Sequence, residues 1–218
     1  MKAARTAVAI AVALILGAPC PARAAVGSQS NKAPAVPENP WAYSITVDGY
    51  FSPNQAAYAT PIVTADRSWL HLEGRYNYED LDTGSLWVGY NFAAGKKLVL
   101  NVTPMIGGVF GRTNGVAPGF EASLTYKKIA LSVSNEYVYN PEYKTENFYY
   151  SWLQLTYSPS KWLNFGALTQ HTKAFGSAAY EQPGLFAGVS HKQWQFTTYV
   201  FSARLNDPTA ILEAGVNF

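Results

Sequence analysis

The sequence has a single cysteine and few charged residues. Cys20 is the only cysteine among 218 residues, and it lies near the start of the chain. Charged residues make up only 14% of the chain. A soluble domain usually carries about 25%. The first deficit excludes disulfides and cysteine metal sites from the rest of the chain, and the second argues against an ordinary soluble domain.

Long apolar runs are also missing beyond the first two dozen residues. A membrane-spanning helix needs about 20 consecutive apolar residues, and no such run occurs from Ala25 onward. Aromatic residues are abundant instead, with 15 Tyr, 11 Phe and 6 Trp, and 48% of the chain is hydrophobic. This composition predicts a transmembrane β-barrel, in which short strands cross the membrane.

Motifs of common catalytic and metal sites are absent. No G-x-S-x-G elbow, H-E-x-x-H site or EF-hand loop occurs. Without the basic residues Lys2, Arg5 and Arg23 of the N-terminal segment, the formal charge changes from +2 to −1. We therefore expect no cofactor, no metal and no nucleic-acid partner.

The N-terminus has the pattern of an export signal. Lys2 and Arg5 precede an apolar stretch at 7–18, and residues 22–24 read A-R-A, a small-x-small cleavage site. We expect residues 1–24 to be a signal peptide that is cleaved after Ala24. Residues 25–40 contain three prolines and few large apolar side chains, which predicts a flexible periplasmic leader. The barrel would then occupy residues 41–218.

The segment from Trp69 to Glu79 shows the strand pattern most clearly. One face would carry Leu70, Leu72, Gly74, Tyr76 and Tyr78, and the other His71, Glu73, Arg75, Asn77 and Glu79. Alternate residues of a strand point to opposite faces. Either the apolar face covers a soluble core, or it faces lipid while the charged face lines a lumen.

Similar alternation continues to the end of the chain and predicts an all-β, antiparallel, up-and-down barrel of about twelve strands. We expect strands at about 41–51, 55–64, 68–79, 85–92, 98–110, 119–126, 129–139, 147–158, 162–171, 184–190, 194–203 and 210–218. The first two are the weakest because Pro53 and Pro61 interrupt them, so ten strands is the alternative. Pro104 and the Gly107-Gly108 pair predict a bulge or bend in the fifth strand.

The expected connections alternate between short and long. The short ones are Ala93–Lys97, Lys127-Lys128, Pro159–Lys161 and His191–Gln193, and the long ones are Gly111–Pro118, Asn140–Glu146, Thr172–Pro183 and Arg204–Thr209. Outer-membrane barrels have short periplasmic turns and longer outer loops. This arrangement would leave the C-terminus in the periplasm.

The last strand resembles that of bacterial outer-membrane proteins. It reads I-L-E-A-G-V-N-F, with Leu212, Ala214, Val216 and the terminal Phe218 on one face. The resemblance implies location in the cell outer membrane, recognition by the barrel-assembly machinery, and contact with outer-membrane lipid and lipopolysaccharide. The run from Ala65 to Asp80 also looks like a feature of an uncharacterised outer-membrane family, which implies no function. A soluble periplasmic β-sandwich or small ligand-binding barrel is the alternative.

Aromatic residues at strand ends support lipid on the apolar face. Phe92, Tyr126, Tyr157 and Phe218 are expected at the periplasmic boundary, and Tyr78, Phe110 and Tyr139 at the outer one. Amphipathic aromatic rings favour these boundaries.

The polar face of the strands, opposite the lipid-facing side, then supplies candidate lumen-lining residues. They are His71, Glu73, Arg75, Asn77, Glu121, Glu136, Gln154, Gln195 and Glu213. They would line a porin-like channel for passive diffusion of small hydrophilic solutes. Alternatively, they would form a salt-bridge network inside a closed structural or surface-interaction barrel.

An outer-membrane lipid-modifying enzyme is the third hypothesis. Of the three histidines, His71 would lie in the periplasmic half and His191 in a periplasmic turn, which leaves His171 as the only one placed at the outer rim. The sequence shows no nucleophile near it. We therefore expect no catalytic residues.

Overall fold

The computed structural model describes residues 41–53, 55–201 and 208–218. The predicted signal peptide (1–24) and leader (25–40) lie outside these residues. In the described part of the chain, no helix has the length and apolar character needed to cross a membrane.

The chain forms thirteen β-strands and one short 3-10 helix, η1 (Lys144–Glu146). The strands are β1 (Ala42–Ser52), β2 (Gln55–Arg67), β3 (Leu70–Tyr76), β4 (Thr83–Tyr90), β5 (Phe92–Ala94), β6 (Leu98–Gly111), β7 (Gly115–Tyr126), β8 (Ile129–Val138), β9 (Phe148–Tyr157), β10 (Leu163–Ala174), β11 (Tyr180–His191), β12 (Trp194–Phe201) and β13 (Thr209–Asn217).

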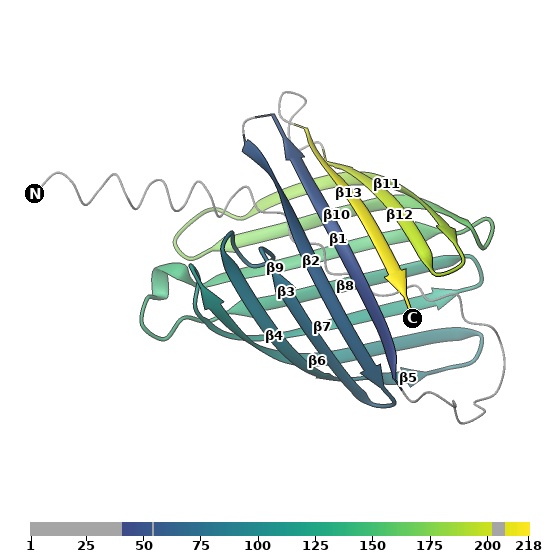
Figure 1. The fold of residues 1–218 in the computed structure, drawn as a ribbon, viewed down its shortest axis with the longest axis horizontal. Helices are drawn as coiled ribbons and strands as arrows, with labels where there is room; N and C mark the ends of the chain where they lie inside the picture. The colour runs from purple at the N-terminus through teal and green to yellow at the C-terminus, as the bar shows by residue number, and fades with distance from the viewer. Residues whose placement is uncertain (1–40, 54, 202–207) are drawn as a thin grey trace, which may run out of the picture.

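The strands close into an antiparallel barrel. Successive strands pair around the wall, and β1 pairs with both β2 and β13, so that the first and last strands meet (Figure 1). The closing ladder runs from Ser44↔Asn217 to Phe51↔Ala210. The predicted all-β, up-and-down barrel is confirmed.

Although thirteen strands are present, β5 does not add a position to the barrel wall. β4 and β5 both pair with β6 in one register, which stops at Gly89↔Met105 and resumes at Phe92↔Val102. Pro104 of β6 lies in this gap, where it offers no N–H to the ladder. β5 therefore continues β4, and the wall has the predicted twelve strands.

The ten-strand alternative is wrong because β1 and β2 are full members of the wall. Pro53 lies in the turn between them. Pro61 pairs with Val47 of β1 and lies one residue beyond Ile62↔Arg75, where the β2–β3 ladder ends. A proline is tolerated at such a ladder edge.

Of the predicted bulge or bend in the fifth strand, the bulge is wrong. β6 and β7 keep one register from Leu98↔Tyr126 to Val109↔Gly115. Gly107 instead makes room for the Trp87 indole, because a Cβ at position 107 would lie 2.4 Å from a ring carbon. The glycine thus serves packing inside the barrel.

The barrel exterior is apolar, as a lipid-facing surface requires. Side chains that alternate with the inward ones are exposed along every region of the wall, including Ile45, Val47, Leu72, Leu86, Val88, Ile106, Leu124, Leu131, Leu153, Leu155, Leu185, Val189, Phe196, Val200 and Leu212. Of the two interpretations of the Trp69–Glu79 pattern, the apolar face therefore faces lipid and does not cover a soluble core.

The two ends of the barrel differ. We call the end that carries Phe218 and the connections 68–69, 95–97, 127–128, 158–162 and 192–193 the C-terminal rim. The opposite end, with the connections 77–82, 112–114, 139–147 and 175–179, is the loop rim. The predicted Gly111–Pro118 loop is wrong, because β6 and β7 extend until only 112–114 connects them. The predicted Arg204–Thr209 loop lies mostly outside the described residues.

The aromatic residues predicted at the two membrane boundaries lie at the ends of the barrel, with one exception. Phe92, Tyr126, Tyr157 and Phe218 are exposed near the C-terminal rim, and Phe110 and Tyr139 near the loop rim. Tyr78 is buried inside the barrel instead. Asn77 adopts a left-handed φ of 56°, which ends β3 and breaks the strand alternation.

Two adjacent glycines offer a matched test of the interior packing. Gly107→Ala should destabilise the folded barrel by about 1–3 kcal/mol because the new methyl group overlaps the Trp87 ring. Gly108→Ala meets no atom within 4 Å and should leave stability within about 1 kcal/mol. Urea titration of vesicle-folded protein measures both. Equal costs would show that Trp87 does not pack against Gly107.

Candidate functional site in the barrel interior

Most of the predicted lumen-lining side chains face into the barrel. His71, Glu73, Arg75, Glu136, Gln195 and Glu213 are buried there, while Glu121 and Gln154 are half-buried. Asn77 differs, because it lies in the turn after β3. Its side chain donates to the Ala59 carbonyl and accepts from the Asp82 amide.

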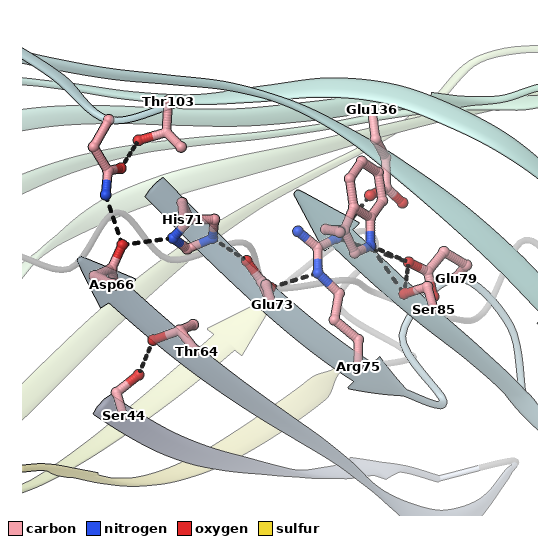
Figure 2. A network of polar contacts seen from close by, with 12 residues as sticks. Ser44, Thr64, Asp66, His71, Glu73, Arg75, Glu79, Ser85, Thr103 and Glu136 are labelled. Atoms are coloured by element: carbon pink, nitrogen blue, oxygen red, sulfur yellow. Dashed lines mark hydrogen bonds and ion pairs between the residues drawn. The ribbon is translucent and has the colours of Figure 1, made fainter. Parts of the chain in front are cut away.

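Alternate residues of β3 form a chain of ion pairs along the inner wall (Figure 2). The Asp66 carboxylate lies 2.8 Å from His71 Nδ1, and His71 Nε2 lies 3.1 Å from Glu73 Oε2. Arg75 Nε then donates to Glu73 Oε1 over 2.5 Å. Glu73 and Arg75, two positions apart on one strand face, therefore pair directly, with His71 as an additional partner of Glu73.

Arg75 also reaches across the interior to another part of the wall. Its Nη1 donates to Glu136 Oε2 of β8 over 2.8 Å, and three strands lie between β3 and β8 along the sheet (Figure 2). The guanidinium lies 4.1 Å from the Tyr78 ring centroid and 4.5 Å from that of Trp87. The two carboxylates and the two rings hold the Arg75 guanidinium in place. Because the ion pairs are buried, removal of either partner would leave an uncompensated charge inside the barrel.

Residues outside the predicted set complete this network. Ser85 Oγ donates to Glu79 Oε1 over 2.6 Å, and Trp87 Nε1 donates to Ser85 Oγ over 2.9 Å. Burial raises the pKa of Glu79, which lies in the 77–82 loop, against the opposing influence of Arg75. Strand parity places Ser85 and Trp87 inward. Alternation also predicted Glu79 on the charged face of the Trp69–Glu79 segment, but Glu79 was not among the candidate lumen-lining residues, and it lies beyond the break at Asn77.

The other end of the β3 chain is anchored to β6. Asn91 donates its side-chain amide to Asp66 over 2.7 Å and accepts from Thr103 Oγ1 over 2.8 Å. Asn91 occupies the gap between β4 and β5, where the ladder is interrupted. The interruption therefore supplies a polar link between β2 and β6 at the inner wall.

An aromatic cluster inside the barrel contains side chains from β1, β2, β9 and β12. Trp152 makes edge-on contacts with Tyr199 and Phe201, with centroids 5.4 and 5.5 Å apart. Tyr50 stacks on Tyr58 at 4.7 Å. Trp152, Phe201 and Tyr50 are each at most 2% exposed. In the half of the barrel toward the loop rim, inward side chains therefore pack against one another and leave little room for water.

The half toward the C-terminal rim is hollow. A cavity of about 1310 Å³ is bounded by β6 to β13. The uncharged polar residues of its wall include Asn101, Ser123, Ser132, Gln154, Thr156, Asn164, Gln195 and Thr197, and Phe186 and Tyr199 also line it. We call this cavity the vestibule. Amide and hydroxyl groups of this kind suit a hydrated or sugar-like solute.

Three of the predicted polar residues belong to this region. Gln154 accepts from Trp152 Nε1 over 3.1 Å and donates to Thr156 Oγ1 over 3.2 Å, and it lines the vestibule together with Gln195. Glu213 is buried just behind the lining, where Tyr199 and Thr197 donate to it over 3.0 and 3.2 Å. The predicted set is therefore divided. His71, Glu73, Arg75 and Glu136 form the ion-pair network, and Gln154, Gln195 and Glu213 belong to the vestibule region, whereas Asn77 lies in the turn after β3 and Glu121 is half-buried on β7 outside the vestibule lining.

No metal centre accompanies these groups. Within residues 41–53, 55–201 and 208–218, no cluster of three or more His, Cys, Asp or Glu side chains has a geometry suited to a metal ion. His71 and Glu73 are committed to each other and to Asp66 and Arg75.

No protein-family model and no curated protein sequence matches the chain. Solved structures do resemble it. The KdgM porin superposes with a TM-score of 0.61 at 10% identity, over 80% of this chain and 99% of that one. A second structure, the KdgM porin in complex with disordered oligogalacturonate, gives 0.58 at 11% identity, over 80% and 99%. The outer membrane protein Omp33 of Acinetobacter baumannii gives 0.50 at 11% identity, over 82% and 98%. At these identities the similarity shows the fold alone: the chain is a closed β-barrel like those of these outer-membrane proteins.

Removal of the central cation should weaken the barrel strongly. Arg75→Met leaves Glu73 and Glu136 buried without their partner, which should cost about 3–5 kcal/mol of unfolding free energy. Arg67→Met is the control, since Arg67 is exposed at the end of β2, where it contacts the Trp41 ring, and its loss should cost about 0–1 kcal/mol. Denaturant titration in vesicles measures the difference. Similar losses in the two variants would contradict a buried Arg75 network.

Proposed function

We propose that the protein is a porin-like channel of the bacterial outer membrane, through which small hydrophilic solutes diffuse passively. The observation that carries this proposal is the vestibule, a polar cavity of about 1310 Å³ inside a closed barrel with an apolar exterior. The fold shared with KdgM and Omp33 supports the same function. The C-terminal rim would face the periplasm, and lipid and lipopolysaccharide would surround the wall.

The passage would be narrow and intermittent. The vestibule ends at Phe186 and Tyr199, beyond which Trp152 and Phe201 are packed together. Solute would cross this half only when side chains separate. The inward glutamates, with His71 and Arg75, would then border the path.

A closed structural or surface-interaction barrel is the second candidate. It is favoured by the packing of the loop-rim half, where Tyr50, Trp152, Phe201 and Ile211 are all at most 2% exposed. The two candidates differ in one property, ionic current, so conductance distinguishes them.

The constriction should limit conductance. In planar bilayers, the wild-type barrel should give small, intermittent currents, and Trp152→Ala/Phe201→Ala should raise conductance several-fold because two rings leave the passage. Leu153→Ala, which changes a lipid-facing neighbour, should leave conductance unchanged.

Folding of each variant is checked by resistance to detergent unfolding, and Trp152→Leu/Phe201→Leu provides a milder pair if the alanine variant fails to fold. No current from either folded protein would reject the channel and favour the closed barrel.

For the lipid-enzyme hypothesis, the structure places polar residues beside His171, but none of them is a nucleophile hydrogen-bonded to it. On the outward face near the loop rim, His171 lies in register between Ser151 of β9 and Glu181 of β11. Its Nδ1 lies 3.3 Å from Glu181 Oε1. Among the contacts of the described residues, no hydrogen bond joins Ser151 to His171. We propose that this row is structural.

Phospholipid turnover tests that assignment. Refolded protein should release no lysophospholipid or fatty acid from vesicles, and His171→Ala should behave as wild type. Release that disappears in both His171→Ala and Ser151→Ala would instead establish a hydrolase.

A further inference from the structure

Lysine side chains surround the vestibule mouth. Lys96 and Lys97 lie in the 95–97 connection, and Lys127 and Lys128 form the next turn at this rim. Lys161 lies in 158–162 and Lys192 in 192–193, and all six lysines line the cavity. Four successive connections of the C-terminal rim, from β5–β6 to β11–β12, therefore each contribute at least one cation.

These lysines have no acidic partners among the described residues. No aspartate or glutamate lines the vestibule, and no ion pair in the described part of the chain includes any of the six. Lys128 Nζ donates to the Pro159 carbonyl over 2.8 Å, and Lys127 Nζ lies 5.2 Å from the Tyr126 ring centroid. All six side chains are exposed, so their charges act on the solution at the mouth.

Charge of the other sign is concentrated elsewhere. The carboxylates of the loop-rim connections include Glu79, Asp80, Asp82, Glu142 and Glu146, and Glu181 lies at the start of β11 beside that rim. Among the interior carboxylates, Glu73 and Glu136 are held by Arg75 and His71, and Glu213 by Thr197 and Tyr199. Asp48 and Glu121 also lie inside the barrel, outside the vestibule lining. The loop rim also carries Arg112, Lys144 and Lys173, so that six carboxylates face three cations there among the described residues, whereas the vestibule mouth carries lysines without carboxylates.

We infer that the vestibule binds small hydrophilic anions that carry carboxylate or phosphate groups. A concave mouth lined by one sign of charge concentrates ions of the other sign, and rings of lysine select anions in pores. Asn101, Gln154, Asn164 and Gln195 supply amide groups for the uncharged parts of such a solute. The inference names the solute class of the proposed channel and so rests on that function, but binding is measurable without current.

Calorimetry of the refolded chain in zwitterionic detergent measures this binding. Citrate and glucose 6-phosphate represent the two anionic groups, and sucrose is the neutral comparison. Both anions should bind, sucrose should bind at least about tenfold more weakly, and added salt should weaken only the anions. A stronger response to one anion would identify its group as the preferred one. Equal binding of sucrose, or no binding of either anion, would overturn the inference.

Lysine variants test the mouth directly. Replacement of all six by glutamine should weaken anion binding at least about tenfold. Lys144→Gln/Lys173→Gln removes two cations near the loop rim and should leave binding unchanged. If the sixfold variant fails to fold, Lys127→Gln/Lys192→Gln should show an intermediate loss. Wild-type affinity in a folded lysine variant would overturn the inference.

The competing source of anions is the membrane itself. Binding is therefore repeated with the barrel in phosphatidylcholine vesicles and in vesicles that also contain phosphatidylglycerol. Citrate affinity should be similar in both, because the mouth opens to solution. Its disappearance only with the anionic lipid would show that headgroups occupy the lysines and would overturn the inference. If the barrel binds citrate but carries no current, the channel proposal fails and the binding site stands.

Discussion

The hydrogen-bonding requirement of the backbone in lipid determines this fold. Hydrocarbon offers no partner for an N–H or C=O group, so a sheet can cross a membrane only if it has no free edge. The β1–β13 ladder removes that edge, from Ser44↔Asn217 to Phe51↔Ala210. Once the wall is closed, strand alternation turns Leu72 outward and Glu73 inward, and every polar side chain of the inward parity must find a partner inside.

The inward polar side chains are accommodated in two different ways along the barrel axis. Toward the loop rim, Arg75 links Glu73 to Glu136 while aromatic rings occupy the remaining space. Toward the C-terminal rim, amide and hydroxyl groups border a cavity large enough for solute. A packed half gives stability, and an open half gives access, so solute flow would depend on movement of the packed side chains. Trp152 and Tyr199 meet at the boundary between the halves.

The wall was largely predictable from sequence, because alternation and composition are local properties. Tyr78 was misplaced, since the left-handed Asn77 that ends β3 leaves no mark on the apolar pattern. The Arg75–Glu136 pair joins residues 61 positions apart, and its existence depends on strand stagger around the closed wall. The four lysine-bearing turns were predicted at one rim, but the cavity that their lysines border was not, because it depends on which inward side chains fill the barrel.

The central claim is that the lumen is open to water on one side of the constriction and packed on the other. Thiol labelling tests it directly, because the sequence from Ala25 onward has no cysteine of its own. A cysteine at Gln154, which lines the vestibule, should react quickly with a charged water-soluble thiol reagent, whereas one at Ser85, 1% exposed, should react far more slowly. Equal rates in the folded barrel would contradict the packed half.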